Sequence, residues 1–202
     1  MGLTCSLHRA SEAEIDRLLA EPDAVDAFLY PEDGTLKVRA VRPKGVLGWL
    51  LRLTPVTIEE VVPGSDSGAA ARPDPDRTID IDKGWHGLHF LFTGTANEGD
   101  EPACYFARGG EDLDDEGHAR ALRPGQVRRF AAYLDTLTPE ELARRYDPAT
   151  MTKLEIYPDV IWKRPFAPDE SPLGWLTGCY AEVRQFVKKA AASGDGLIIN
   201  IS

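Results

Sequence analysis

The stretch that decides the fold is Thr78–Thr95, which reads TIDIDKGWHGLHFLFTGT. On a helix, which advances about 100° per residue, Trp85, Leu88 and Phe92 fall on one face. As a strand, the same segment would divide poorly between an inner and an outer face, because apolar residues would point both ways. The sequence therefore predicts a helix over Lys83–Thr93, preceded by a short extended segment.

The ends of this helix and its polar residues form a second pattern. Asp82 stands where a side chain can cap the first turn, and Gly94 stands where a left-handed residue can end a helix. His86, His89 and Thr93 form a polar stripe beside the apolar face. We expect His89 to hydrogen-bond inward at the edge of the core, and His86 to lie at the surface.

These polar residues are the candidate site, and they allow two interpretations. In the first they are architectural, serving as helix cap and core residues. In the second, His86 and His89 aim at one metal ion, and an aspartate before the helix completes a hydrolytic or metal-dependent site. Zinc helices usually space their histidines by about four residues, so we expect no bound metal. The candidate functional or ligand-facing residues are Asp80, Asp82, His86, His89 and Thr93.

The two ends of the chain carry strand patterns. Apolar and polar residues alternate over Leu3–His8, which predicts a first strand. Ser11 and Glu14 then form a capping box that predicts a helix. At the other end, a long helix pattern begins at Pro172, and the apolar run Leu197–Ile201 predicts a buried strand.

Strands at both termini with helices between them predict an α+β domain. We expect a small mixed sheet that includes the N- and C-terminal strands and packs against several helices. The length of 202 residues fits a single domain over 1–202. An exposed loop is expected at 63–77, which is rich in Gly, Ser, Ala, Pro and Asp without periodicity. Further strands are expected at Leu36–Val41, Ala103–Ala107 and Lys153–Tyr157, and a further helix at Gly45–Leu53.

Composition limits the partners and the compartment. The chain holds 33 acidic and 23 basic residues, for a net charge of -10, which argues against broad nucleic-acid or anionic-membrane surfaces. A basic partner is compatible with that charge. Its 3 cysteines are far apart and include no CxxC pair, which favours a reducing, cytoplasmic setting. We expect no nucleic-acid partner and no membrane partner.

Established cofactor and catalytic motifs are missing or incomplete. The sequence contains no phosphate-binding glycine motif of the P-loop or dinucleotide type. Asp112 and Asp114 imitate the start of a calcium loop, but Arg123 stands where that loop needs a bidentate glutamate. At Gly64–Gly68, Asp66 occupies the position where a nucleophile elbow has serine. No cofactor is therefore expected.

Four segments give the chain a family resemblance. They are the glycine-second N-terminus with its capped helix, IDIDKGWHGLHFLFTGT, GHARALRPGQVRRFAAYL, and EIYPDVIW with the closing helix and strand. Together they resemble the YfbM-like family, a bacterial domain of unknown function. The resemblance is weakest over about 31–77. It implies a single α+β domain and a bacterial cytosolic setting, and it carries no activity.

Because no complete catalytic or cofactor motif is present, the sequence favours a binding function over an enzymatic one. We expect a soluble bacterial binding or interaction module without catalytic activity, in a regulatory or immunity-like role toward a protein partner. The alternative is a hydrolase or metal-dependent enzyme that uses Asp80, Asp82, His86 and His89.

Overall fold

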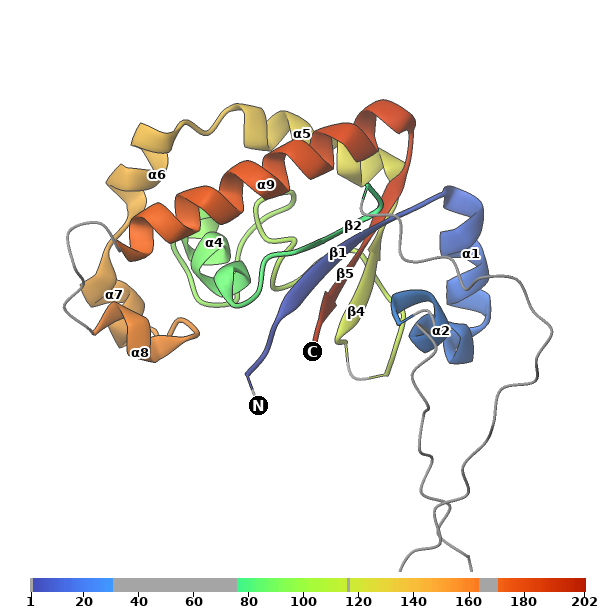
Figure 1. Cartoon of the computed structure of the whole chain (residues 1–202), viewed down its shortest axis with the longest axis horizontal. Coiled ribbons are helices and arrows are strands. Elements are labelled where there is room, and N and C mark those ends of the chain that lie inside the picture. Colours follow the sequence, from blue (N-terminus) through green and yellow to red (C-terminus); the bar gives the residue numbers. More distant parts are fainter. Residues whose placement is uncertain (1, 31–75, 116, 164–170) are drawn as a thin grey trace, which may run out of the picture.

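Helices gather on both sides of one sheet in the computed structural model, which describes residues 2–30, 76–115, 117–163 and 171–202 (Figure 1). No helix within these ranges is long and apolar enough to cross a membrane. The strands are β1 (Cys5–Ala10), β2 (Thr78–Asp80), β3 (Glu111–Asp112), β4 (Ala119–Leu122) and β5 (Gly196–Ile201). The helices are α1 (Glu12–Ala20), the short 3-10 helix η1 (Pro22–Ala24), α2 (Val25–Leu29), α4 (Gly84–Thr93), α5 (Pro124–Asp135), α6 (Pro139–Arg145), α7 (Pro148–Lys153), α8 (Asp159–Trp162) and α9 (Pro172–Ser193).

The sheet has the strand order β2-β1-β5-β4-β3. Both terminal strands belong to the sheet, as the sequence predicts. Strands β1 and β5 lie side by side, and each also pairs with a second strand. This double pairing explains why β5 is almost continuously apolar. The expectation of mixed strand directions is corrected, because every pairing between described strands is antiparallel. The α+β fold class is confirmed.

Two of the expected strands are turns instead. At Ala103–Ala107 the Cys104 carbonyl accepts hydrogen bonds from the backbone of Ala107 and Arg108, which closes a turn and prevents extension. The segment Lys153–Tyr157 begins with the last residue of α7 and continues as a turn. Short apolar runs of this kind do not distinguish a strand from a buried turn by periodicity alone.

Three sequence expectations fall wholly or largely outside the described residues. The expected strand at Leu36–Val41 and the expected helix at Gly45–Leu53 both lie outside them. Of the expected loop at 63–77, the structure describes only Asp76 and Arg77, which are exposed and form a turn before β2.

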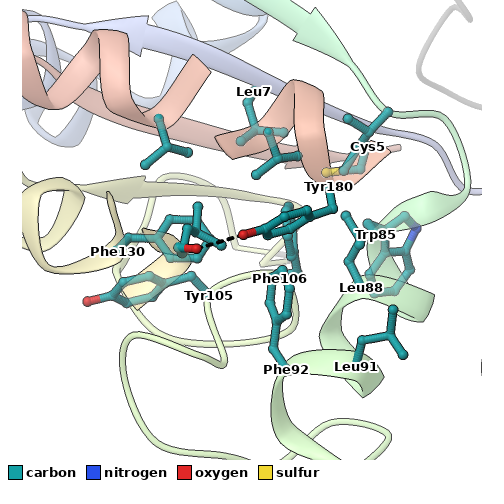
Figure 2. Close-up of a cluster of buried hydrophobic side chains, with 14 of the residues drawn as sticks. Cys5, Leu7, Trp85, Leu88, Leu91, Phe92, Tyr105, Phe106, Phe130 and Tyr180 are labelled. Atoms are coloured by element: carbon teal, nitrogen blue, oxygen red, sulfur yellow. Dashed lines mark hydrogen bonds between the residues drawn. The ribbon is translucent and has the colours of Figure 1, made fainter. Parts of the chain in front are cut away.

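One face of the sheet, here called the inner face, supports the larger core. It packs against α4, α5 and α9, and Tyr180 of α9 reaches into the cluster among Phe92, Phe106 and Phe130 (Figure 2). The Tyr180 hydroxyl donates to the Leu134 carbonyl at 2.6 Å, so this polar tip is satisfied inside the core. The apolar sheet residues of the inner face include Cys5, Leu7, Leu122, Leu197 and Ile199, and the buried Arg120 lies opposite Ile199 on the same face.

The crossing of α4 over α9 requires a residue without a side chain. A β-carbon placed on Gly87 would lie 2.7 Å from Leu176 Cδ2 and 3.2 Å from a ring carbon of Trp162. Gly87 therefore lets the two helices approach closely, and a larger residue would force Leu176 to move.

The opposite face, here called the outer face, supports a smaller core. Ile15 and Leu18 of α1 and Val25 and Leu29 of α2 cover its apolar end. The predicted capping box starts α1, since the Ser11 hydroxyl accepts from Glu14 N–H and the Glu14 carboxylate accepts from Ser11 N–H. The sheet residues of the outer face include Ser6, His8, Ala10, Ala119, Ala121, Ile198 and Asn200, with Asp80 and Thr78 of β2 opposite Ser6 and His8.

The helix predicted over Lys83–Thr93 forms, but its N-terminal end differs from the prediction. Helix α4 spans Gly84–Thr93, and Gly94 ends it with a φ of 75°, as its sequence predicts. Asp82 is not the N-cap, because Lys83 holds that position and no side chain caps the first turn. Asp82 itself has a φ of 47°, so its backbone turns the chain from β2 into the helix. The predicted cap at Asp82 is therefore wrong.

Candidate functional site

The two aspartates of the predicted site lie at the surface and are engaged locally. Asp80 Oδ1 accepts the backbone N–H of Asp82 at 2.7 Å, and Asp82 Oδ1 accepts Lys83 Nζ at 2.8 Å. Both carboxylates are exposed, whereas the histidines of α4 are buried. Within the described ranges, no three His, Cys, Asp or Glu side chains are grouped so that they could hold a metal ion.

His86 is a structural bridge rather than a surface residue. Its ring is only 8% exposed, Nε2 donates to the Ala96 carbonyl at 2.8 Å, and Nδ1 accepts Tyr157 N–H at 2.9 Å. These two bonds assign the neutral tautomer with hydrogen on Nε2. Burial lowers the pKa of His86, and the bond to Ala96 partly offsets that change. The ring thus ties α4 to two later segments, and the surface expectation for His86 is wrong.

His89 is more deeply buried than expected, and it lacks the hydrogen bond that the sequence predicted for it. Its side chain is 0% exposed, and neither ring nitrogen makes a well-formed hydrogen bond among the described residues. The Glu98 backbone lies near enough to raise the pKa of the ring slightly, but no bond of normal geometry joins the two. Burial lowers the pKa of His89 to about 4, and the nearby charges of His86, Arg120 and Arg108 lower it further. The expected inward hydrogen bond is not formed. A ring sealed from solvent in this way cannot exchange protons with a bound substrate.

Thr93 belongs to the end of the helix rather than to a site. Its hydroxyl donates to the His89 carbonyl at 2.9 Å and lies 3.1 Å from the Thr95 hydroxyl. These bonds satisfy the last turn of α4 and start the following loop. The five predicted residues therefore do not converge, and the alternative enzyme built on Asp80, Asp82, His86 and His89 lacks a shared site.

A second polar group, which sequence reasoning missed, lies on the outer face. Ser6 Oγ is 2.9 Å from His8 Nε2, and His8 Nδ1 is 3.2 Å from Thr78 Oγ1. The His8 ring is 8% exposed and faces Phe28 at 6.1 Å between ring centroids. Burial lowers the pKa of His8 to about 4. Asn200 stands directly opposite Ser6 on β5.

A cavity of about 430 Å³ adjoins this face between α2, the loop before β4 and the end of β5. The Asn200 amide donates to the Tyr30 hydroxyl at 3.0 Å across one wall. Apolar side chains of Val25 and Leu29 form another part of the lining. The polar lining residues are Asp23, Asp26, Tyr30, Asp114, His118, Asn200 and Ser202.

The carboxylate side chains described in the lining of this cavity are all aspartates, so they give it negative charge. Asp114 is already engaged, because its two oxygens accept the backbone N–H groups of His118 and Ala119. Asp23 and Asp26 are exposed, and no hydrogen bond or ion pair occupies their carboxylates within the described part of the chain. No lysine or arginine is among the described lining residues. The cavity can therefore receive a cationic group without displacing one.

The sequence did contain one signal for the polar group on the outer face, namely the polar side of strand β1. Ser6 and His8 already alternate with apolar residues in the sequence, which places them together on one face of a strand. His8 contacts Thr78, Ser6 lies opposite Asn200, and Asn200 in turn bonds Tyr30, so the group draws on three distant segments. Only the strand order brings these residues together, so spacing along the chain did not reveal the group.

Comparisons with known proteins agree on the fold and on the family. The family model described as a domain of unknown function, DUF1877, matches residues 1–200. The crystal structure of a protein of unknown function, YfbM from Escherichia coli, superimposes with a TM-score of 0.63 at 16% identity, covering 98% of this chain and 99% of that chain. No curated protein matches the chain. The resemblance to the YfbM-like family is confirmed, and the chain belongs to the DUF1877 family, a domain of unknown function.

Proposed function

We propose that the protein is a binding module that takes a cationic group of a basic partner into the cavity beside α2. The observation that carries this proposal is the lining itself. Asp23 and Asp26 present open carboxylates, and no described lysine or arginine neutralises them. A net charge of -10 would add long-range attraction for a basic partner.

The shape and chemistry of the cavity favour a lysine or arginine side chain. Val25 and Leu29 offer apolar surface for the aliphatic stem, and the carboxylates can accept the charged tip. Tyr30 lines the same cavity and is 48% exposed, so it adds an aromatic ring that a cation can contact. A volume of about 430 Å³ has room for one such side chain.

This chemistry suits a regulatory or immunity-like role toward a basic protein in a bacterial cytoplasm. Cys5, Cys104 and Cys179 are all free, which supports a reducing compartment. The first two are buried, and burial raises the pKa of each thiol, so these cysteines act as core residues.

Calorimetric titration with a hexa-arginine peptide tests the proposal. The Asp23→Asn and Asp26→Asn variants should each weaken binding roughly two- to fivefold, as the loss of one partly solvated ion pair does. Asp100→Asn is the matched control, because it removes the same charge from an exposed position that does not line the cavity. Equal weakening in all three variants would show that only net charge matters, and it would refute a role for the cavity.

A further inference from the structure

The polar group on the outer face has the arrangement of an activated nucleophile. Ser6 and His8 are two residues apart on β1, so both side chains point to the same side of the sheet. Ser6 Oγ and His8 Nε2 are 2.9 Å apart. His8 Nδ1 lies 3.2 Å from Thr78 Oγ1 on the neighbouring strand β2. Nucleophile, base and a group that orients the base are the three parts that such a site needs.

One assignment of hydrogens satisfies all three side chains. If Nδ1 carries the hydrogen and donates it to Thr78, Nε2 is free to accept the Ser6 hydroxyl. The neutral ring is then in the tautomer that can remove the serine proton. Thr78 takes the orienting place that a carboxylate fills in many serine hydrolases.

We propose that Ser6 is a nucleophile toward activated esters, with His8 as its general base and Thr78 as a positioning residue. This goes beyond the proposed binding function, and it would revise the expectation of a module without catalytic activity. The site is independent of Asp23 and Asp26, so either proposal can fail without the other.

The neighbours of Ser6 offer what an acyl group would need. Asn200 stands opposite Ser6 on β5, and paired residues on one face place their side chains within about 5.5 Å at the β-carbon. One hydrogen of its amide is held by the Tyr30 hydroxyl, and the other is the donor we assign to a carbonyl oxygen beside Ser6. The apolar wall of Val25 and Leu29 lines the adjoining cavity and can receive a small acyl chain.

The chemical step conserves atoms and electrons. Ser6 Oγ forms a bond to the ester carbonyl carbon while its proton passes to His8 Nε2. The carbon–oxygen bond to the leaving group then breaks, and His8 returns the proton to the departing alcohol. Water repeats the sequence on the acyl-serine, which releases the acid and restores Ser6.

Covalent labelling with a fluorophosphonate probe tests the nucleophile directly. Ser6 attack would form the phosphorus–oxygen bond and expel fluoride, and mass spectrometry of the N-terminal peptide would locate the adduct. We expect the full chain to carry one adduct at Ser6, and Ser6→Ala to carry none. Ser193→Ala is the control, because Ser193 is an exposed serine outside this group.

Variants of the base and of the positioning residue separate chemistry from packing. His8→Gln should slow labelling about 100-fold, the usual contribution of a general base. Thr78→Val should slow labelling about tenfold, while Thr78→Ser, which keeps the hydroxyl, should restore it. Melting temperatures measured in parallel show that each variant remains folded.

Two results would overturn the proposal. One is the absence of an adduct at Ser6 in the folded wild-type chain. The other is labelling of folded His8→Gln within about threefold of the wild-type rate, since a general base contributes far more. Either result would mean that the Ser6, His8 and Thr78 side chains serve only to join β1 to β2.

Discussion

The two faces of the sheet differ in what they bury. The inner face presents Leu7, Leu122 and Ile199 to the larger apolar core under α4, α5 and α9, and the buried charge of Arg120 on this face is bonded to backbone carbonyls. The outer face has apolar packing at one end only, and at the other end it presents Ser6, His8 and Asn200. The difference teaches that the inner face supplies most of the stability, and that the outer face holds the polar groups available to a ligand.

The largest expected effect tests that division directly. Leu88 of α4 is 0% exposed, and Leu88→Ala should cost about 2–5 kcal/mol of unfolding free energy, measured in urea. Leu29 of α2 is 7% exposed at the margin of the outer core, so Leu29→Ala should cost about 2 kcal/mol or less. Equal losses in the two variants would contradict the contrast between the faces.

Acid should weaken both faces, because each buries a histidine in its neutral form. Burial lowers the pKa of His89 on the inner side and of His8 on the outer face from 6.5 to about 4. A depressed histidine pKa means that the unfolded chain binds the proton more tightly. The stabilisation is therefore fully present above about pH 6.5 and declines as the pH falls toward about 4.

Each of the two histidines should contribute roughly 1–3 kcal/mol to this acid loss. Urea unfolding at pH 7 and at pH 4.5 measures the loss. His89→Leu and His8→Leu should each flatten the pH dependence, whereas His118→Leu is the control, because its ring is exposed. A pH dependence that is the same in all three variants would show that other groups cause the acid loss.

Local patterns predicted those parts of the fold that local forces determine. Helix α4 follows from the spacing of Trp85, Leu88 and Phe92, and α1 follows from its capping box. The strands at both ends were predicted from alternation and from apolar run length. Each of these signals acts within one element, so a single sequence contains it.

Contacts between distant segments could not be predicted in the same way. His86 is buried because Ala96 and Tyr157 bring their backbone groups to its two nitrogens. His89 was expected to have such partners and has none among the described residues. Helical position placed His89 at the border of the core and His86 further round, at the surface, and only the tertiary packing decided which ring is hydrogen-bonded. The outer-face group was missed for the same reason.

The two histidines of α4 provide a sharper test within the inner side. His86→Leu should cost about 2 kcal/mol, because the Ala96 carbonyl and the Tyr157 N–H lose a buried partner. His89→Leu should be neutral or stabilise by about 1 kcal/mol, because it replaces two unpaired buried nitrogens with apolar atoms. Thermal unfolding at pH 7 measures both. A larger loss for His89→Leu than for His86→Leu would contradict the assignment of the two roles.

The smallest expected effect concerns the turn that leads from β2 into α4. Asp82 has a φ of 47°, a left-handed conformation that costs an ordinary residue about 1 kcal/mol and that glycine adopts freely. Asp82→Gly should therefore leave the unfolding free energy unchanged or raise it by up to about 1 kcal/mol. Asp82→Ala should lower it by a similar amount, because alanine tolerates this conformation less well than aspartate, and both variants lose the same exposed ion pair to Lys83. Were Asp82 the helix cap, both variants would be destabilised, the glycine variant by a few tenths of a kcal/mol and the alanine variant by about 1 kcal/mol. A gain in Asp82→Gly with a loss in Asp82→Ala, measured by urea unfolding, therefore separates a strained turn from a cap, and a loss in both would restore the cap.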